Sequence, residues 1–240
     1  KLPLYLMLVP AFVLLGFFHY YPMYGIIVAY KDYDPFIGFA ESPWVGWRHF
    51  QRLVSTPDIL QVIRNTLVIA VGKIVAGQFF SVVFALLLNE VRQVVFKRVI
   101  QSISYVLHFL SWVIFGAILL DMLKMQGMVN NILAALGLER IVFLGKPVLF
   151  PPTAIFSHVW KEFGWGAVIY FAALAGIDPT LYEAAAVDGA NRWQRVLKIT
   201  LPGLAPTIVL LSCLSLGGVL NAGFEQILML YNPAIYETAD

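Results

Sequence analysis

The chain has 240 residues, of which 60% are hydrophobic and 12% are charged, and its formal net charge is +2. A mean hydropathy of +0.80, with repeated apolar runs of about twenty residues, excludes an ordinary soluble domain and predicts an all-α, polytopic helical membrane protein. The net charge is too small and too scattered to indicate a nucleic-acid partner. One cysteine, Cys213, lies inside an apolar run and cannot form an intrachain disulfide.

The apolar runs predict five membrane spans in a single transmembrane domain. They cover approximately residues 4–29, 62–88, 99–122, 152–175 and 206–224. The long segment at 30–61, which mixes Asp, Pro, Gly and Trp, is interpreted as a structured external loop.

The second span contains a lysine, Lys73, close to a Gly72/Ala76 pair that favours close helix contact. A charge inside a span is costly unless it faces the helix bundle or a water-filled cavity. Lys73 is therefore a candidate for the substrate pathway. The alternatives are pairing with another helix and snorkelling toward the membrane surface. In the third span, His108 is interpreted as an interhelical hydrogen-bonding group.

The fourth span concentrates polar and aromatic residues in its outer half, namely His158, Trp160, Lys161 and Glu162. His158 and Glu162 are four residues apart and share a helix face. Such a group suits a sugar, because rings cover its apolar C–H faces while polar groups meet its hydroxyls. The alternative is an interfacial anchor with an internal ion pair.

The longest polar, helix-forming interval between two apolar runs occupies residues 183–202, within a loop expected at 178–202. Each of its charged side chains would cost about 3 kcal/mol at the bilayer centre, so the interval must lie in water or against another protein. Asp178 and Pro179 are typical of an N-cap and a first helical residue. Gly189 is a natural helix stop, and Asn191 is placed to cap a second helix.

The second short helix has an amphipathic pattern. Trp193, Val196 and Leu197 fall at i, i+3 and i+4 and predict one apolar face. Pro202 permits a change of direction into the fifth span. A bent element with an apolar stripe is suited to docking into a groove on a partner, and the alternative is a solvated loop.

This interval also carries a motif, which consists of Glu183-Ala184-Ala185, Asp188-Gly189-Ala190 and Ile199-x-Leu201-Pro202. Its spacing resembles, without a gap, the EAA motif of permease subunits in binding-protein-dependent ABC importers. The preceding residues 174–182 resemble the carbohydrate-uptake branch, and the segments 30–33 and 160–175 loosely resemble permeases for oligosaccharides and polysaccharides. Only the motif is highly specific, and family members often carry Phe where Val196 stands.

The resemblance implies a type I ABC importer permease fold in which the motif forms a cytoplasmic coupling helix. The residues expected to couple to the ATPase are Glu183, Ala184, Ala185, Asp188, Gly189, Ala190, Arg192 and Trp193. The implied partners are a dimer of cytoplasmic ATP-binding subunits, a second permease subunit, an external solute-binding protein and a saccharide. A sixth span is expected beyond residue 240. ATP hydrolysis is expected on the partner, and no catalytic, cofactor or metal site is expected in this chain.

Three further residues are candidates for the substrate pathway. In similar sugar permeases the helix after the motif helps to line that pathway, which nominates Asn221, Phe224 and Gln226. Basic residues at 89–98 and an acidic tail favour a cytoplasmic N-terminus in a bacterial inner membrane. Two alternative functions are an ABC permease for another solute, such as a peptide or phosphate, and an intramembrane enzyme that uses His158, Glu162 and Lys73.

Overall fold

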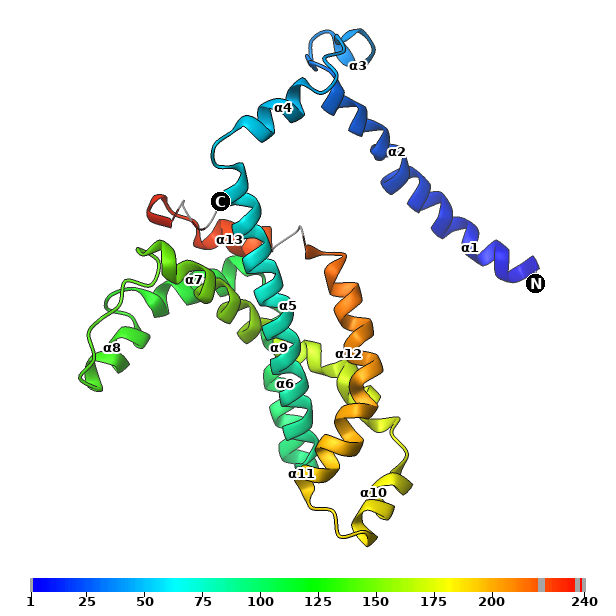
Figure 1. Cartoon of the computed structure of the whole chain (residues 1–240), viewed down its shortest axis with the longest axis vertical. Helices are drawn as coiled ribbons and strands as arrows, with labels where there is room; N and C mark the ends of the chain where they lie inside the picture. The colour runs from blue at the N-terminus through cyan, green and yellow to red at the C-terminus, as the bar shows by residue number, and fades with distance from the viewer. Residues whose placement is uncertain (1, 220–222, 236–237, 239–240) are drawn as a thin grey trace. The chain divides into compact units, whose positions relative to one another are not determined.

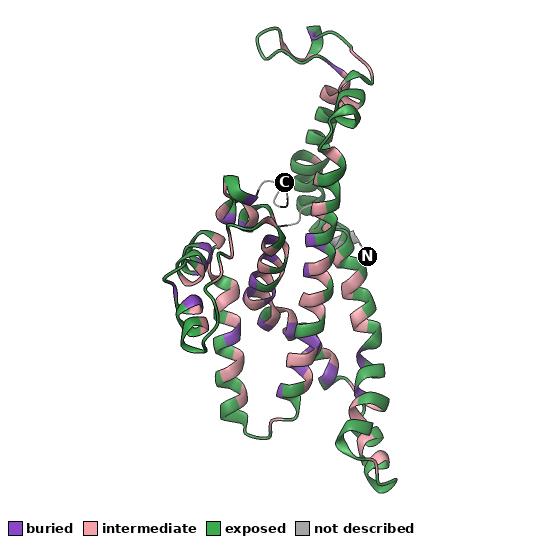
Figure 2. Ribbon diagram, turned by 60° about the vertical axis from the view of Figure 1, so that its left-hand side comes forward, coloured by how far each residue is buried: buried purple, intermediate pink, exposed green. Residues whose placement is uncertain are grey.

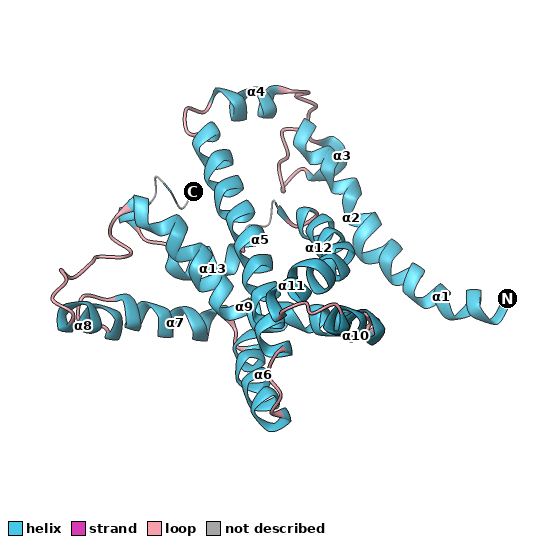
Figure 3. Cartoon of the chain, turned by 60° about the horizontal axis from the view of Figure 1, so that its bottom comes forward, coloured by secondary structure: helices cyan, strands magenta, loops and turns pink. Residues whose placement is uncertain are grey.

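The computed structural model describes residues 2–219, 223–235 and 238. The regular elements of these residues are helices joined by loops (Figure 3), and one isolated antiparallel bridge pairs Lys31 with Trp44. The chain divides into two compact units, Lys1–Leu60 and Gln61–Asp240. The expectations of a single functional domain and of a sixth span beyond residue 240 stay predictions.

The first unit begins with one long helical run. Its elements are α1 (Leu2–Leu15), the π-helical turn η1 (Gly16–Tyr20), α2 (Tyr21–Met23) and the 3-10 helix η2 (Tyr24–Tyr30). Together they provide a candidate membrane span, Tyr5–Tyr30. The backbone N–H of Tyr21 reaches Gly16 across the π turn, and this wider turn precedes Pro22, which has no N–H to donate.

The rest of the first unit is a folded loop with the short helices α3 (Gly38–Glu41) and α4 (Arg48–Ser55). The Lys31 ammonium donates to the carbonyls of Phe39 and Ala40, at 2.8 and 3.2 Å. Arg48 and Asp32 form an ion pair of 2.7 Å. The segment is therefore structured, as the sequence indicates.

The second unit packs its helices around α9 (Figure 1), against which α6, α12 and α13 all lie. The elements are α5 (Ile59–Asn89), α6 (Val94–Phe109), α7 (Trp112–Leu123), α8 (Met128–Ala135), η3 (Pro147–Leu149), α9 (Phe150–Ala175), α10 (Pro179–Val187), α11 (Arg192–Arg195), η4 (Val196–Thr200), α12 (Leu201–Leu216), α13 (Phe224–Leu230) and η6 (Pro233–Ile235). The helices α5 and α9 cover the residues expected as the second and fourth spans.

Two buried clusters hold this unit together. The first joins α5, α9 and α12 through Val82, Ala85, Ala167, Tyr170, Leu174 and Leu204. The second joins α5, α7, α9 and α13 through Ile69, Leu119, Phe150, Ala154 and Leu230, together with Ile235 of η6. The outward faces are largely exposed (Figure 2), and in each of the four unbroken candidate spans at most 28% of the most apolar stretch is buried. Apolar faces of this length require lipid or another membrane subunit as their surroundings.

The segment predicted as a single third span, 99–122, is instead divided into α6 and α7. Leu110 and Ser111 are extended, and the Ser111 hydroxyl accepts the backbone N–H of Ile114 at 3.3 Å. This side chain caps a new helix and so ends the previous one. The helices α7 and α8 together give the candidate span Trp112–Ala135.

The helix that carries the fifth span also differs from its prediction, because the continuous apolar helix that could hold this span covers Arg192–Leu216 and not 206–224. No change of direction occurs at Pro202. The helix continues through the π turn η4, where the Leu201 N–H bonds to the Val196 carbonyl. The wider turn accommodates a proline that has no N–H to donate. The second half of the predicted loop is therefore the first part of a long helix.

The close approach of α6 and α9 gives a test of the packing. A Cβ added to Gly164 would lie 2.6 Å from both the Cβ and the carbonyl oxygen of Ser104. We expect Gly164→Ala to destabilise the protein by about 1–3 kcal/mol, because backbone cannot yield as a side chain can. The measurement is the thermal unfolding midpoint of the detergent-purified complex.

The matched control is Gly77→Ala in α5, where an added Cβ meets nothing within 4 Å. This variant should leave the midpoint almost unchanged, since Ala is also the better helix former. Equal midpoints for the two variants would contradict the packing of α6 on α9 described here.

Candidate functional site

The residues 178–200, called here the bent element, begin with the predicted cap. The Asp178 carboxylate accepts the backbone N–H of Thr180 at 2.9 Å, and Pro179 is the first residue of α10. This hydrogen bond holds the pKa of the exposed Asp178 carboxyl below its ordinary value. Because the pKa of Asp178 is lower in the folded state, the ionised carboxylate stabilises the fold at neutral pH. This contribution to stability is lost only as the pH falls through the lowered pKa.

The predicted stop and second cap are also confirmed. Gly189 has a φ of +75°, and Ala190 donates its N–H to the Ala185 carbonyl at 2.9 Å. The Asn191 side chain accepts from the Gln194 N–H at 2.9 Å, and the Gln194 side chain accepts from the Asn191 N–H at 2.8 Å. These reciprocal bonds form a capping box that starts α11.

The bent element is tied at both ends to long helices. The chain bends by 69° between Pro147–Ala175 and α10, whereas α11 runs directly into α12. The Tyr182 and Thr200 hydroxyls lie 3.0 Å apart and link α10 to η4. The Arg195 Nε donates to the Ala190 carbonyl at 3.1 Å. These contacts fix the angle between the two short helices.

The surface of the bent element is mixed in character. Of the residues expected to couple to the ATPase, Glu183, Ala184, Asp188, Gly189, Arg192 and Trp193 are exposed, and Ala185 and Ala190 are half-buried. Leu181 and Val187 of α10 are exposed apolar residues, with Val187 at 88%. Exposed apolar side chains beside carboxylates are typical of a surface that meets another protein.

The predicted apolar stripe on the second helix exists, but it faces the neighbouring span. Trp193, Val196 and Leu197 line an apolar groove of about 730 Å³ whose opposite wall is α5. Trp193 and Leu197 remain exposed, so docking of this stripe on a partner stays a prediction. The exposed apolar side chains of α10 offer a further surface for the same role.

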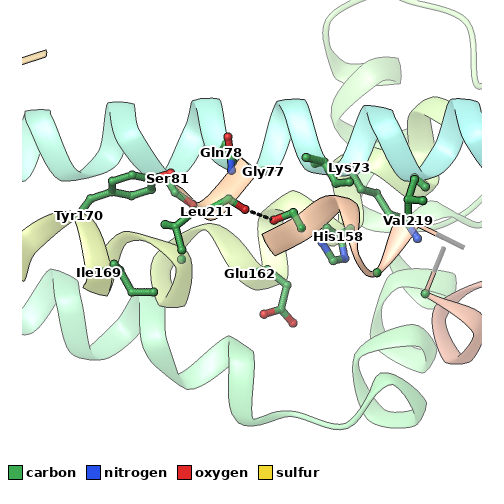
Figure 4. A pocket seen from close by; sticks show the side chains of 16 residues that line it. Lys73, Gly77, Gln78, Ser81, His158, Glu162, Ile169, Tyr170, Leu211 and Val219 are labelled. Carbon is green, nitrogen blue, oxygen red and sulfur yellow. Dashed lines mark hydrogen bonds between the residues drawn. The ribbon is translucent and has the colours of Figure 1, made fainter. Parts of the chain in front are cut away.

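A second feature is a polar cavity of about 340 Å³ between α5, α9 and α12 (Figure 4). Its lining includes Lys73, Gln78, Ser81, His158, Glu162, Gly166, Tyr170, Leu211, Ser215, Val219 and Gly223. On α9, His158, Glu162, Gly166 and Tyr170 recur every four residues and so form one helix face. Polar groups on a single face within a span are placed to meet a bound solute and not lipid.

Glu162 is held in a network that connects α9 to α6. Its carboxylate lies 2.6 Å from His108 Nδ1 and accepts from the Lys161 ammonium at 2.9 Å. Lys161 also donates to the His108 carbonyl at 2.8 Å. The His108 ring stacks on Trp165, with 4.6 Å between centroids and 4° between planes. The interpretation of His108 as an interhelical hydrogen-bonding group is confirmed.

The structure brings together only some of the candidates for the substrate pathway. Lys73, His158 and Glu162 line the cavity. Trp160 packs instead against the second buried cluster and against the buried Phe115, with 5.4 Å between the two ring centroids. Lys161 is buried behind Glu162.

Two further candidates, Phe224 and Gln226, lie in the first turn of α13. The buried Gln226 side chain donates to the Ala154 carbonyl and to Ser157 Oγ, both at 2.7 Å. Phe224 is exposed and is not among the residues that line the cavity. Asn221 lies outside the described residues.

Sequence reasoning missed several cavity residues, notably Gln78 and Tyr170. The Ser212 hydroxyl donates to Gln78 Oε1 at 2.8 Å, which orients the amide. Within the described part of the chain, Gln78 Nε2 and the buried Tyr170 hydroxyl have no hydrogen-bonding partner. The sequence signal that could have identified Tyr170 is the recurrence of cavity residues every four positions from His158 to Tyr170.

The chain is helical, has a polar cavity between its spans, and joins the bent element to two walls of that cavity. This is the architecture of a membrane transport subunit. Residues 77–237 match the family of binding-protein-dependent transport system inner membrane components, and the chain belongs to that family. It is therefore a permease subunit of an ABC importer. This membership removes the alternative of an intramembrane enzyme.

Similar proteins support this assignment over nearly the whole chain. The chain is 41% identical to protein LplB and 40% identical to the polygalacturonan/rhamnogalacturonan transport system permease protein YteP, both of Bacillus subtilis strain 168. These matches cover 99% of this chain and 75% and 74% of the relatives. A chain of a bacterial ABC transporter involved in the import of the acidic polysaccharide alginate superposes with a TM-score of 0.89. It is 40% identical, and the match covers 99% of this chain and 80% of that chain.

The network around Glu162 can be tested by a double-mutant cycle. We expect Glu162→Gln to destabilise the complex by about 3 kcal/mol, because the buried Lys161 ammonium then loses its carboxylate. The pair Lys161→Met and Glu162→Gln should recover part of this loss, since both charges are then absent. The measurement is the thermal unfolding midpoint of the purified complex.

The control is Glu225→Gln, which alters an exposed carboxylate and should leave the midpoint unchanged. A double variant no more stable than Glu162→Gln alone would show that the network does not balance these charges.

Proposed function

We propose that this chain forms part of the translocation pathway for an oligosaccharide or polysaccharide and is coupled to cytoplasmic ATP-binding subunits through the bent element. The observation that carries the proposal is its 40% identity and TM-score of 0.89, over 99% of the chain, to a subunit of an importer for an acidic polysaccharide. A similarity of this extent covers both the cavity and the bent element.

The chemistry of the cavity supports a saccharide as the solute. The Nε2 group of Gln78 and the hydroxyl of Tyr170 are hydrogen-bonding groups without a protein partner in the described residues. Sugar hydroxyls both donate and accept, so they can satisfy such groups. The cavity volume of about 340 Å³ lies within the range of about 300–1,000 Å³ common to small-molecule sites.

The bent element supports coupling to an ATPase. Its exposed carboxylates at Glu183 and Asp188 and its exposed apolar Leu181 and Val187 form a surface that a groove on a partner can receive. ATP must favour one of two states of the permease, because a ligand shifts an equilibrium only through its different affinities for the two states. Movement at the bent element then passes along α9 and α12 to the cavity.

The proposed assembly contains two permease subunits, a dimer of cytoplasmic ATP-binding subunits and an external solute-binding protein. A second solved structure supports the last of these partners, since it holds the similar alginate transporter in complex with alginate pentasaccharide-bound periplasmic protein. With the ATPase inside, the N-terminus of this chain lies in the cytoplasm and the membrane is a bacterial inner membrane.

Co-purification tests the proposal directly. The chain, purified through an affinity tag in mild detergent, should carry with it an ATP-binding subunit and a second permease. The ATPase activity of the reconstituted complex should rise with a saccharide-loaded solute-binding protein. Recovery of the chain without an ATPase, or stimulation by a peptide or phosphate and not by any saccharide, would contradict the proposal.

The coupling role of Gly189 gives a further prediction. Proline requires a φ near −65°, so Gly189→Pro must distort a turn that holds a φ of +75°. We expect this variant to insert into the membrane and to lose most saccharide uptake while ATP hydrolysis persists. The measurements are uptake into proteoliposomes and phosphate release from the same sample.

The chain offers a matched control in Gly137→Pro at the end of α8. Gly137 has a φ of +77°, and the same pair of backbone hydrogen bonds closes its turn, with Leu138 bonded to Leu133 at 2.9 Å. Distortion there should leave the ratio of uptake to hydrolysis unchanged. Equal ratios in the two variants would count against a coupling role for Gly189.

A further inference from the structure

The covalent links of α10 to the membrane helices both contain a change of direction. Before α10 the chain bends by 69° after Ala175, and after α10 it passes through the left-handed turn at Gly189. The helices α10 and α11 lie at one end of the second unit, joined by this turn (Figure 1). A glycine turn adopts other backbone angles at small cost, so the backbone alone leaves the angle between α10 and η4 adjustable.

The helix α10 has an outer and an inner side. Leu181, Glu183 and Val187 are exposed, whereas Tyr182 and Ala185 are half-buried. Tyr182 and Ala185 are three residues apart and so lie on the same side of the helix. The outer side is available to the ATP-binding subunit that we propose to dock here. The inner side faces the rest of the bent element.

One side-chain hydrogen bond joins α10 to the helix Arg192–Leu216 in the described part of the chain. It connects the hydroxyls of Tyr182 and Thr200, which lie 3.0 Å apart. Thr200 is 4% exposed, and its hydroxyl donates to the Arg195 carbonyl at 3.4 Å. With the Thr200 hydrogen directed there, Tyr182 is the donor and Thr200 Oγ1 is the acceptor. Because Thr200 is buried, a bond to water does not readily replace this contact.

This bond reaches the second helix at the point where the π turn η4 passes into α12. Thr200 is the last residue of η4. Close by, a Cβ built on Gly203 would lie 2.8 Å from Ile177 Cδ1, so α12 closely approaches the segment between α9 and α10. Leu174 of α9 and Leu204 of α12 also share a buried cluster. The end of α9, the helix α10 and the start of α12 therefore meet at one joint.

We propose that the hydrogen bond between Tyr182 and Thr200 is the link through which a displacement of α10 moves α12, which makes Tyr182 a positioning residue for coupled transport. This inference rests on the proposed coupling of the bent element to an ATPase and names the contact that carries it. With the bond intact, α10, η4 and the start of α12 move together. Without it, α10 follows the ATP-binding subunit by turning about its bend and its glycine turn, and α12 stays behind.

The test measures saccharide uptake and phosphate release in the same proteoliposomes. These contain the complete importer, with its ATP-binding subunits and its solute-binding protein. Tetragalacturonate, alginate pentasaccharide and maltotetraose are each offered, and the one that the unsubstituted importer takes up fastest is used for the variants. Tyr182→Phe removes one hydroxyl and keeps the ring. We expect the saccharide taken up per ATP hydrolysed to fall about fivefold, the effect of losing one hydrogen bond.

Three variants separate coupling from a structural role. Thr200→Val removes the partner hydroxyl at nearly constant shape and should give the same fall. Thr200→Ser keeps that hydroxyl and should keep the ratio of uptake to hydrolysis. Tyr105→Phe makes the same chemical change in α6, where the ring packs on Trp165, and should also leave the ratio unchanged. A bond that only stabilised the fold would lower uptake and hydrolysis together.

Each outcome decides the inference. An unchanged ratio in Tyr182→Phe, or a proportional loss of uptake and hydrolysis, overturns it and leaves the proposed function standing. The pair Tyr182→Phe and Thr200→Val should lose no more than either change alone, and a loss equal to the product of the two would show that they do not act through one bond. Failure of the unsubstituted importer to take up any of the three saccharides overturns the proposed function itself. If the Tyr182→Phe complex does not assemble, the ratio in the Thr200→Val complex decides in its place.

Discussion

The charged side chains of the bent element cannot be buried in lipid, and this constraint determines how the rest of the second unit is built. Residues 178–200 must remain outside the hydrocarbon, yet the backbone that enters and leaves them belongs to two membrane helices. The helix α9 reaches them through Gly176 and a bend of 69°, and the helix Arg192–Leu216 starts within them. Because a hydrogen-bonded helix is stiff along its axis, a displacement of the bent element is transmitted to both helices at once.

The same two helices carry walls of the polar cavity. His158 and Glu162 project from α9, and Ser215 comes from the far end of α12. The network of Glu162 with Lys161 and His108 fixes α9 to α6 on one side. The cavity then opens between α9, α12 and the lysine-bearing face of α5. A site enclosed by helices that share one external element can change shape when that element moves, which is what alternating access requires.

Local signals allowed much of this arrangement to be predicted from the sequence. Asp178, Gly189 and Asn191 act through backbone bonds with residues a few positions away, so their roles follow from residue type and spacing. Other features depend on tertiary contacts. The break at Ser111 is not predicted, because an apolar run fits a continuous span equally well. The continuation of the helix through Pro202 is not predicted either, because a proline usually marks a helix boundary and nothing in the residue pattern announces the π turn that accommodates it. Trp160 and Lys161 belong to the polar cluster in sequence, but the helix rotation directs them toward other neighbours.

The most direct test of the central claim uses a single cysteine at the exposed position Ala184. The natural cysteine, Cys213, is replaced by serine in the same protein. The claim is that the bent element meets the ATPase on the cytoplasmic side of the membrane. In intact cells this cysteine should resist a membrane-impermeant thiol reagent, and a photoreactive group attached to it in membranes opened to the cytoplasmic side should cross-link to the ATP-binding subunit. Labelling from outside the cell, without any adduct to that subunit, would contradict the account.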